Sequence, residues 1–396
     1  MEKQLASRGL RPAGDDPEAR LGYRQRFDSV AEAERLARRR LPRAMFERLN
    51  RGTDDSVTFM ANRRAYREVS FRPRAAAVHE PRSTRTTVLG AEVSTPILLA
   101  PVGALRLQHP AGVQAAVAAA TRFGTVCAVS PAAGHALEEI PVRPGSLLWY
   151  QVTTALGGRD AAERQLDRAR ARGYHAVVVT VDSGLRPKAA PLRLDLRSAV
   201  DLAPDLIRHP SWTWGFVRDG LRVSVASTAL GATAAPGARP LAWDDIDWIV
   251  KRWDGPVVVK GVLTSEDASQ AVARGAAAVV VSNHGGLTLD GIGPTLAALP
   301  EVMDAVAGRA EVLLDGGIRA GADVAKALAL GAQAVLIGRA YVMGLAVGGA
   351  AGVHRVLELL DADLNRTLGF LGCAGVSDLG PGHVTMPGSW RSQNVV

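Results

Sequence analysis

Short apolar runs alternate with alanine-rich helical patterns along most of this chain, from Thr95 onward. Each run is only a few residues long, rich in Val, Ile, Leu and Ala, and ends at a polar or glycine-containing turn. Runs of this kind are typical of parallel strands that are buried on both faces. The sequence predicts eight such strands, at Ile97–Ala100, Thr125–Val129, Leu147–Gln151, Ala176–Val181, Val257–Lys260, Ala278–Ser282, Glu311–Asp315 and Ala334–Ile337.

Helical patterns occupy the segments between these strands. Eight strand–helix units with short connections predict an α/β protein whose strands close into a (β/α)8 TIM barrel. The alternative, an open doubly wound sheet, more usually has fewer strands and a glycine fingerprint after the first one, so we favour the barrel. The clearest predicted helices are Gly112–Arg122, Asp160–Arg172, Ser265–Arg274, Thr295–Ala307 and Gly321–Leu330.

Other elements are predicted outside the regular alternation. Residues 28–51 have apolar positions near helical spacing, interrupted by Pro42, which predicts two short N-terminal helices. Val88–Val93 is a predicted hairpin or entry strand, and Ala351–Leu368 a closing helix. One long connection, 183–240, follows the fourth strand, and loops of this length are usually lids, binding loops or disordered segments.

The domain organisation follows from these elements. We predict a disordered tail at 1–27, a single barrel domain at 28–385 that carries the long loop insertion, and a C-terminal tail at 386–396. The N-terminal tail mixes charges with Gly and Pro and lacks the apolar centre of a signal peptide. We therefore expect a cytoplasmic protein.

Composition narrows the functional classes. With 47% hydrophobic and 22% charged residues, the chain has the balance of a well-packed soluble protein. No uncharged apolar run approaches the ~20 residues that span a bilayer, so we predict no membrane span. The net charge of +8 comes from basic residues spread along the chain without a matching motif, which predicts no nucleic-acid partner. Two cysteines, of which Cys127 lies in an apolar run, fit reducing surroundings and suggest no metal site.

The sixth predicted strand ends at Ser282-Asn283-His284-Gly285-Gly286. The C-terminal rim of a barrel is where this architecture keeps its chemistry. An imidazole there suits removal of a proton from a substrate hydroxyl or amine, although a histidine can also simply cap such a turn. Asp182, at the end of the fourth strand, could orient that ring and stabilise its charged form; the alternative is an aspartate in an ordinary turn.

The remaining strand ends predict a bound phosphate and a planar ring system. Glycine turns after strands seven and eight, beside Arg319 and Arg339, form the phosphate cradle expected at this end of a barrel. Lys260 ends a strand of valines, so it is poorly explained as a surface lysine. A fixed cation there would stabilise the negative charge of a reduced flavin. Small polar side chains complete the ring site, at Ser130, Gln151 and Thr180.

Together these segments resemble the FMN-dependent 2-hydroxy acid oxidase and dehydrogenase family, which includes glycolate oxidase, lactate oxidase and L-lactate dehydrogenase. The resemblance covers about Leu41 to Val384 and rests on Leu41-Pro42, Phe71-Arg72-Pro73-Arg74, Thr180-Val181-Asp182, Val259-Lys260-Gly261-Val262, Val281-Ser282-Asn283-His284-Gly285-Gly286, Leu289-Asp290, Leu314-Asp315-Gly316-Gly317 and Ile337-Gly338-Arg339.

The resemblance implies a role for each matched residue. His284 would be the base, Asp182 its partner and Lys260 the cation beside FMN. The family is often a homotetramer, so we expect the same here. The FMN-binding residues implied are Pro101, Val102, Gly103, Ser130, Gln151, Thr180, Lys260, Ser282, Asp315, Gly317, Arg319, Gly338 and Arg339.

Four positions that the resemblance assigns to the substrate depart from the family pattern. The usual carboxylate-binding arginine is Leu287, and its partner tyrosine is Arg48. A second tyrosine is Thr153, and a common tryptophan is Ala132. Loss of the arginine clamp should weaken binding of a small hydroxy acid, since each charged hydrogen bond contributes ~1.5–3 kcal/mol.

Three explanations fit these departures. A basic residue, Arg48, Arg186 or Lys188, has taken over the carboxylate, or the pocket accepts a bulkier substrate without one. The sequence is also similar to the pre-mycofactocin synthase branch of the family, which lacks that arginine and oxidatively deaminates a peptide-derived amine. Ser282–Leu289 and Ile337-Gly338-Arg339-Ala340-Tyr341 carry this second resemblance.

We therefore predict an FMN-dependent oxidoreductase that oxidises the α-carbon of its substrate, at a CH–OH or CH–NH bond. The substrate is a small molecule or a peptide-derived compound, and O2 or another acceptor takes the electrons. A flavin-binding scaffold without activity is the alternative. Intact His284, Asp182 and Lys260 argue against it.

Overall fold

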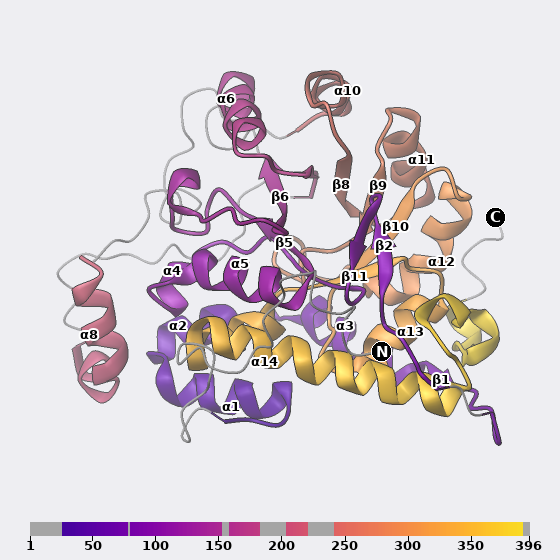
Figure 1. Cartoon of the computed structure of the whole chain (residues 1–396), viewed down its shortest axis with the longest axis horizontal. Helices are drawn as coiled ribbons and strands as arrows, with labels where there is room; N and C mark the ends of the chain where they lie inside the picture. Colours follow the sequence, from indigo (N-terminus) through magenta and orange to yellow (C-terminus); the bar gives the residue numbers. More distant parts are fainter. Residues whose placement is uncertain (1–25, 78–79, 153–157, 183–202, 221–240, 391–396) are drawn as a thin grey trace, which may run out of the picture.

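Eight parallel strands close into a barrel, which confirms the predicted (β/α)8 TIM barrel (Figure 1). The computed structural model describes residues 26–77, 80–152, 158–182, 203–220 and 241–390. The barrel strands follow one another in chain order, and the last pairs with the first. They are β4 (Ile97–Leu99), β5 (Val126–Val129), β6 (Leu147–Val152), β7 (Ala176–Thr180), β8 (Val257–Val262), β9 (Ala278–Val281), β10 (Glu311–Asp315) and β11 (Ala334–Ile337).

All eight strands form where the apolar runs predict them. The strands β10 and β11 have the predicted bounds, and the others differ by one or two residues at an end. The largest difference is in β8, which continues past Lys260 to Val262 through a register shift against β9. Gly261, with φ +111°, supplies the backbone conformation at this irregularity.

Helices cover the outside of the barrel, mostly at the predicted positions. One expectation was wrong: the connection between β5 and β6 has no α-helix and carries only the 3-10 turn η3 (Leu137–Glu139). Pro131, Pro141 and Pro144 lie in this connection, and proline blocks continuous helical hydrogen bonding. The helices are α4 (Leu105–Gln108), α5 (Gly112–Phe123), α6 (Gly158–Ala171), α8 (Pro210–Arg218), α10 (Trp243–Arg252), α11 (Ser265–Ala273), α12 (Thr295–Val306), α13 (Gly321–Ala329) and α14 (Arg339–Leu371).

Three helices precede the barrel, of which the sequence pattern predicted two. Helices α1 (Val30–Arg40) and α2 (Arg43–Leu49) meet at Pro42, as expected. Helix α3 (Val57–Glu68) was not predicted. Its buried positions are four and three residues apart, the spacing of one helical face, but polar residues occupy several of them. The buried face consists of Thr58, Phe59, Asn62, Ala65 and Tyr66.

The long C-terminal helix contains the predicted closing helix Ala351–Leu368. Gly348 and Gly349 break the helical conformation of α14, so it consists of two helices joined at a kink. By length and composition α14 is the one described helix apolar enough to cross a membrane, but 78% of its most apolar window is buried inside the protein. Helix α1 packs along it, and Arg40 Nη1 donates to the carbonyl of Val347 beside the kink (2.8 Å).

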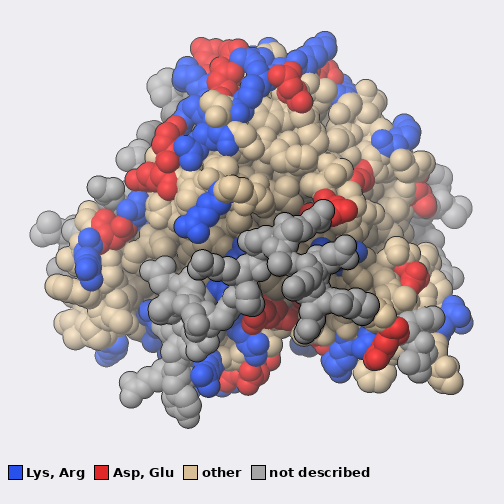
Figure 2. Space-filling model, in the orientation of Figure 1, with Lys and Arg blue, Asp and Glu red and all other residues tan. Residues whose placement is uncertain are grey.

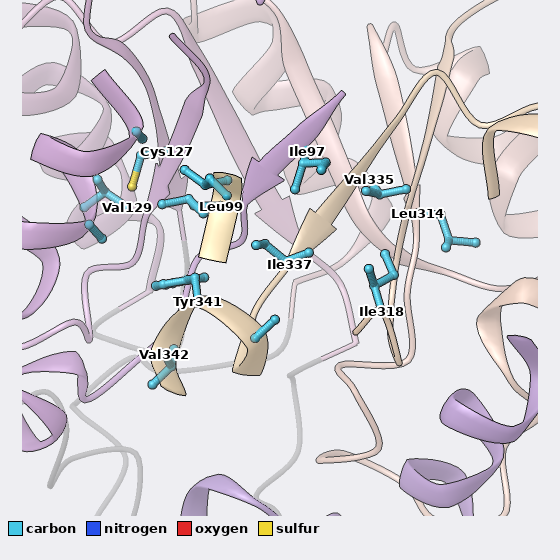
Figure 3. Packing of buried hydrophobic residues seen from close by; sticks show 14 of the residues in the cluster. Ile97, Leu99, Cys127, Val129, Leu314, Ile318, Val335, Ile337, Tyr341 and Val342 are labelled. Atoms are coloured by element: carbon cyan, nitrogen blue, oxygen red, sulfur yellow. The ribbon is translucent and has the colours of Figure 1, made fainter. Parts of the chain in front are cut away.

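The core has two layers, because successive side chains of a strand point to opposite sides. One set, including Leu98, Trp149 and Leu313, fills the barrel interior. The other set packs between the strands and the helices, and Figure 3 shows it where β4, β5 and β11 meet the start of α14. Each fully buried Val, Leu or Ile side chain contributes about 1.5–3 kcal/mol, so both layers stabilise the scaffold.

A hairpin closes the N-terminal end of the barrel. Strands β2 (Thr86–Val88) and β3 (Ala91–Val93) form it, which confirms the predicted hairpin. The N–H of its turn residue Leu89 donates to Glu311 Oε1 (2.9 Å), and the carbonyl of Leu89 lies 3.0 Å from His175 Nε2. The opposite end, where the strands finish, is left for the site.

A second small sheet pairs the chain's early and late segments. Strand β1 (Ser70–Phe71) runs antiparallel to β12 (Val384–Thr385), and the 3-10 turns around it lie near the C-terminus. These turns are η5 (Val376–Asp378), η6 (Pro381–His383) and η7 (Gly388–Trp390). Most of the predicted tails, and the loop segments 183–202 and 221–240, lie outside the described residues.

Candidate active site

His284 and Asp182 meet at the C-terminal end of the barrel, as the strand ends predict. His284 Nδ1 lies 3.0 Å from Asp182 Oδ1. An ionised carboxylate only accepts hydrogen bonds, so Nδ1 carries the proton and Nε2 keeps the lone pair in the neutral ring. Asp182 is largely enclosed, and burial raises its pKa, but His284 and Lys260 outweigh this and hold the pKa below its ordinary value. The pair can therefore accept a proton at Nε2.

The backbone of His284 is held in an unusual conformation. Its φ is +54°, in the left-handed region that L-residues seldom adopt, and strain of this kind is found at functional sites. The amide N–H of His284 donates to Ser282 Oγ (3.2 Å). A Cβ on Gly286 would lie 2.7 Å from the backbone nitrogen of Phe59, so helix α3 packs directly against this turn. The ring is thus fixed by the scaffold.

Lys260 lies at the centre of a buried polar network. Its side chain is 5% exposed, and Nζ donates to Ser282 Oγ (2.8 Å) and to Asp315 Oδ2 (3.0 Å). Burial lowers the pKa of Lys260, but attraction to Asp315 and Asp182 outweighs it and leaves the pKa above its ordinary value. An ammonium group has three N–H donors, and Ser282 and Asp315 accept two of them. The charge of Lys260 is therefore fixed in place.

Two further predicted side chains contact each other on neighbouring strands. Gln151 Nε2, on β6, donates to Thr180 Oγ1, on β7, at 2.7 Å. On β5, Ser130 is 6% exposed, and its Oγ accepts from the amide of Ala132 (3.2 Å). The structure therefore arranges small polar groups along one arc of the barrel mouth.

Arg319 and Arg339 form a cationic cluster after β10 and β11. Neither makes an ion pair with a carboxylate in the described part of the chain. Burial, together with Arg63, lowers the pKa of Arg319 to about 10. Burial, together with Arg319, lowers the pKa of Arg339 to about 9. Guanidinium groups that repel one another in a buried place are stabilised by an anion, so the cluster suits a phosphate dianion.

Arg339 is held mainly by carbonyl groups of the N-terminal segment. Nε donates to Leu49 O (2.9 Å), Nη1 to Gly285 O (2.9 Å) and Nη2 to Arg51 O (2.8 Å). Its guanidinium also lies 4.7 Å from the centre of the Phe59 ring. The end of α2 and the His284 turn are therefore tied together through one arginine.

Sequence reasoning missed the contribution of helix α3. Asn62 and Asn283 exchange amide hydrogen bonds of 2.8 and 2.9 Å, and Asn62 Oδ1 also accepts from the amide of Thr295 (3.2 Å). At Gly317, with φ +84°, any Cβ would overlap the carbonyl oxygen of Asn62. Only the buried polar spacing of α3 could have indicated this role, since these contacts join residues far apart in sequence.

The other residues predicted to bind the cofactor line the same end. Pro101, Val102 and Gly103 follow β4, and a Cβ on Gly338 would lie 3.8 Å from Val102. Gly103 lies beside Ala132, since a Cβ there would be 3.5 Å from the Ala132 side chain. The first and last strands of the barrel thus converge at these turns.

The structure describes only some of the residues assigned to the substrate. Leu287 is 36% exposed, three residues after His284, and Ala132 is 5% exposed. Arg48 lies on α2 next to Leu49, the residue that Arg339 contacts. Thr153, Arg186 and Lys188 lie outside the described residues.

The unpartnered polar atoms of the site suit a flavin ring and its phosphate. Several buried polar atoms at the barrel mouth have no hydrogen-bond partner among the described residues: Asp182 Oδ2, Asp315 Oδ1 and Arg319 Nε. Acceptors lie beside Lys260 and a donor lies in the arginine cluster, which is the polarity that a ring with N–H and C=O groups and a phosphate require. No group of His, Cys, Asp and Glu side chains suited to a metal ion occurs in the described segments.

Comparison with known proteins identifies a family and several relatives. Residues 37–386 match the family model described as FMN-dependent dehydrogenase. Pre-mycofactocin synthase of Mycobacterium tuberculosis is 38% identical over 380 residues, covering 91% of this chain and 95% of the relative. L-lactate oxidase of a Nostoc species is 39% identical over 358 residues, covering 89% and 96%.

Solved structures agree with the same fold. The crystal structure of (S)-mandelate dehydrogenase, described as a monotopic membrane protein, has a TM-score of 0.83 at 30% identity and covers 91% of this chain and all of that one. Mandelate oxidase has a TM-score of 0.76 at 34% identity, covering 91% and 98%.

Proposed function

Because this chain belongs to the FMN-dependent dehydrogenase family, we propose that it oxidises the α-carbon of its substrate at a CH–OH or CH–NH bond. It is an oxidoreductase with FMN as cofactor. The observation that carries the proposal is the His284–Asp182 pair at 3.0 Å, beside the buried Lys260. A proton acceptor and a cation on one rim are what this oxidation needs.

Different residues at the barrel mouth would bind the phosphate and the ring system of the cofactor. Arg319, Arg339 and the glycine turns before them would hold the FMN phosphate. Lys260, Gln151, Thr180 and Ser130 would meet the ring system. When bound, FMN accepts the electrons that leave the substrate carbon. Lys260 supports this transfer, since its raised pKa keeps the ammonium charged.

His284 performs the proton transfer in this proposal. Nε2 takes the proton from the hydroxyl or amine of the substrate, and Asp182 stabilises the imidazolium that results. The low pKa of Asp182 keeps the carboxylate ionised throughout the neutral range, so the pair holds its charge complementarity during turnover. The fixed left-handed backbone of His284 keeps Nε2 in one place.

The substrate is proposed to lack a small carboxylate anchor. Leu287 stands where the family resemblance expects an arginine, and it belongs to an apolar rim. Val57 and Met60 share one face of α3, and Asp290 accepts hydrogen bonds from the amides of Val57 and Thr58, which brings Leu289 to that face. Val57, Met60, Leu287 and Leu289 are 55%, 60%, 36% and 64% exposed. An apolar group on the substrate suits such a rim.

The second candidate reaction is oxidative deamination of a peptide-derived amine. It is supported by the 38% identity to pre-mycofactocin synthase over 91% of this chain. His284 serves both reactions, because an amine and a hydroxyl present their proton in the same position relative to the α-carbon. The cytoplasmic location, a homotetrameric assembly and transfer of electrons to O2 or another acceptor remain parts of the proposal.

A substrate panel tests the proposal. Purified protein is made anaerobic, and bleaching of flavin absorbance is followed with glycolate, lactate, aryl hydroxy acids, and amine or peptide compounds. We expect bleaching by a bulky aryl or amine substrate and none by glycolate or lactate at ordinary concentrations. Bleaching by the small acids would contradict the role given to Leu287.

The variant Leu287→Arg supplies the matched control. Restoring a bidentate carboxylate partner should strengthen binding of lactate or glycolate by about 10- to 100-fold, from ~1.5–3 kcal/mol per charged hydrogen bond. The concentration dependence of flavin bleaching measures it. Leu289→Arg adds the same charge two residues away and should produce no such gain.

A separate prediction concerns the phosphate cluster. Arg339→Gln should weaken FMN binding by about 10- to 100-fold, because one charged hydrogen bond contributes ~1.5–3 kcal/mol. Quenching of FMN fluorescence during titration of apoprotein measures the affinity. Unchanged affinity in Arg339→Gln would remove this residue from the phosphate site.

A further inference from the structure

Asn62 and Asn283 form a buried polar pair next to His284. Charged side chains of both signs lie at the surface, as Figure 2 shows for one face, whereas these two residues are enclosed, with 2% and 0% of their surface exposed. Asn62 lies in the middle of α3, and Asn283 directly precedes His284. Burying an amide costs free energy unless its hydrogen bonds are made. The pair therefore depends on its partners.

Both amide groups of the pair are engaged in hydrogen bonds. Asn283 Nδ2 donates to Asn62 Oδ1 (2.9 Å) and to the carbonyl of Gly293 (3.1 Å). Asn62 Nδ2 donates to Asn283 Oδ1 (2.8 Å), and Asn62 Oδ1 also accepts from the amide of Thr295 (3.2 Å). Because two reciprocal bonds between planar amides favour one relative orientation, Asn283 is fixed against α3. Two apolar side chains of the same size would fill the space without setting that orientation.

The turn that carries His284 is anchored on both sides of the base. On the C-terminal side, the carbonyl of Gly285 accepts a hydrogen bond from Arg339 Nη1 (2.9 Å). On the N-terminal side, Asn283 is bonded to Asn62. The left-handed φ of His284, +54°, persists only where the surroundings enforce it. Asn62 therefore contributes the anchor that lies next to the base in the chain.

Helix α3 also contacts the turn proposed to bind the FMN phosphate. Tyr66, one helical turn after Asn62, donates through its hydroxyl to the carbonyl of Gly316 (3.1 Å). A Cβ on Gly316 would lie 3.4 Å from the side-chain amide of Asn62. Thr295, whose amide bonds to Asn62, donates through Oγ1 to the carbonyl of Asp315 (2.5 Å). Asn62 thus lies between the turn of the base and the turn of the phosphate.

We propose that Asn62 is a positioning residue for His284. Acting through Asn283, its side-chain amide fixes the turn that carries the base, and α3 holds that turn in register with the phosphate turn. The inference rests on the proposed function, in which His284 accepts the substrate proton and FMN the electrons. Such positioning matters because a displacement of about 1 Å at a reacting group can lower a rate by about 100-fold.

A double-variant cycle tests the proposal by kinetics. Asn62→Leu, Asn283→Leu and the double variant are prepared with bound FMN, and anaerobic flavin reduction is followed over a range of substrate concentrations. In Asn62→Leu the limiting rate constant should fall about 10- to 100-fold, whereas the substrate concentration that gives half of it should change by less than about threefold. The double variant should be about as slow as the slower single variant, because both substitutions break one contact. Effects that multiply would overturn the proposal.

Hydrogen exchange gives a readout besides activity. Mass spectrometry of the full chain with bound FMN follows peptides that contain residues 282–286, where the amides of His284 and Gly286 are hydrogen-bonded within the turn. In Asn62→Leu these peptides should exchange about tenfold faster than in the wild type, because the turn has lost its anchor. Peptides from Ala351–Leu368 should be unchanged. Equal exchange at 282–286 in the two proteins contradicts the proposal.

The matched control is Asn365→Leu, which removes a half-buried amide on α14 that accepts from Arg82 Nε (3.3 Å). It should keep the wild-type reduction kinetics and the wild-type exchange at 282–286. Flavin content checks that each variant is folded. Asn62→Ser, whose shorter side chain cannot make both reciprocal bonds, replaces Asn62→Leu if the latter does not fold. If no compound of the panel reduces the wild type, the proposed function fails, and the exchange comparison still decides whether Asn62 holds the turn.

Discussion

Replacing His284 by alanine should leave the protein yellow and abolish reduction of its flavin by substrate. General-base catalysis contributes about 10²–10⁴-fold, so the rate constant of anaerobic flavin bleaching should fall by about that factor. FMN binding should persist, because the groups proposed to hold it, Lys260 and the arginines, do not depend on the His284 ring for their own contacts. Stopped-flow absorbance with the best substrate from the panel measures the change.

Replacing the carboxylate of Asp182, which orients His284, should cause a smaller decrease in the rate of flavin reduction. Asp182→Asn keeps the size of the side chain but removes the negative charge that stabilises the imidazolium, so bleaching should slow less than in His284→Ala. The variant His383→Ala serves as the control, because that ring contacts Cys373 and Gly380 near the C-terminus. A His284→Ala protein that is reduced at the wild-type rate would exclude His284 from the proton transfer.

The sequence predicts the barrel well because the barrel depends on local patterns. Each strand is a short apolar run closed by a turn, and the chain order of strands is also their order around the barrel. Once the barrel is predicted, its topology brings the C-terminal ends together, so Asp182, Lys260 and His284 could be expected on one rim. The contacts His284–Asp182 and Lys260–Ser282 agree with that expectation.

The elements that sequence reasoning missed depend on distant contacts. Helix α3 buries Thr58 and Asn62. Thr58 bonds to Asp290 and Asn62 to Asn283, more than 200 residues later in the chain. A helix whose buried face is partly polar has a weak hydrophobic pattern, and so the spacing alone did not indicate it. The absence of a helix between β5 and β6 has a local cause, the prolines of that connection. A helix was expected there because a (β/α)8 barrel normally has one after each strand.

Polar pairing shows a further limit of the sequence. Arg339 was predicted as a phosphate ligand from the glycine turn beside it, but nothing local indicated that three carbonyl groups would hold its guanidinium. Asp315 was likewise predicted for the cofactor, but its bond to Lys260 depends on β8 and β10 lying on either side of β9, far from each other in sequence. The residues were identified from the chain, and their mutual contacts were not.

The buried Lys260–Asp315 pair leads to the largest stability effect. Lys260→Met has a similar length and fills the same space, but it leaves the Asp315 carboxylate buried without its cation. Removing one member of a buried ion pair costs about 3–5 kcal/mol, so the free energy of unfolding should fall by that amount. Chemical denaturation of the apoprotein measures it, because bound FMN would add its own stabilisation.

A double variant distinguishes the effect of an unpaired buried charge from the effect of changed packing. Lys260→Met combined with Asp315→Leu removes both charges, and replacing a buried pair by apolar side chains is often neutral in stability. It should therefore unfold at higher denaturant than Lys260→Met alone, and its FMN affinity should still be low, since the cation is absent. If Lys260→Met loses less than about 1 kcal/mol, water or another group compensates Asp315, and Lys260 is not the charge that holds this end of the barrel together.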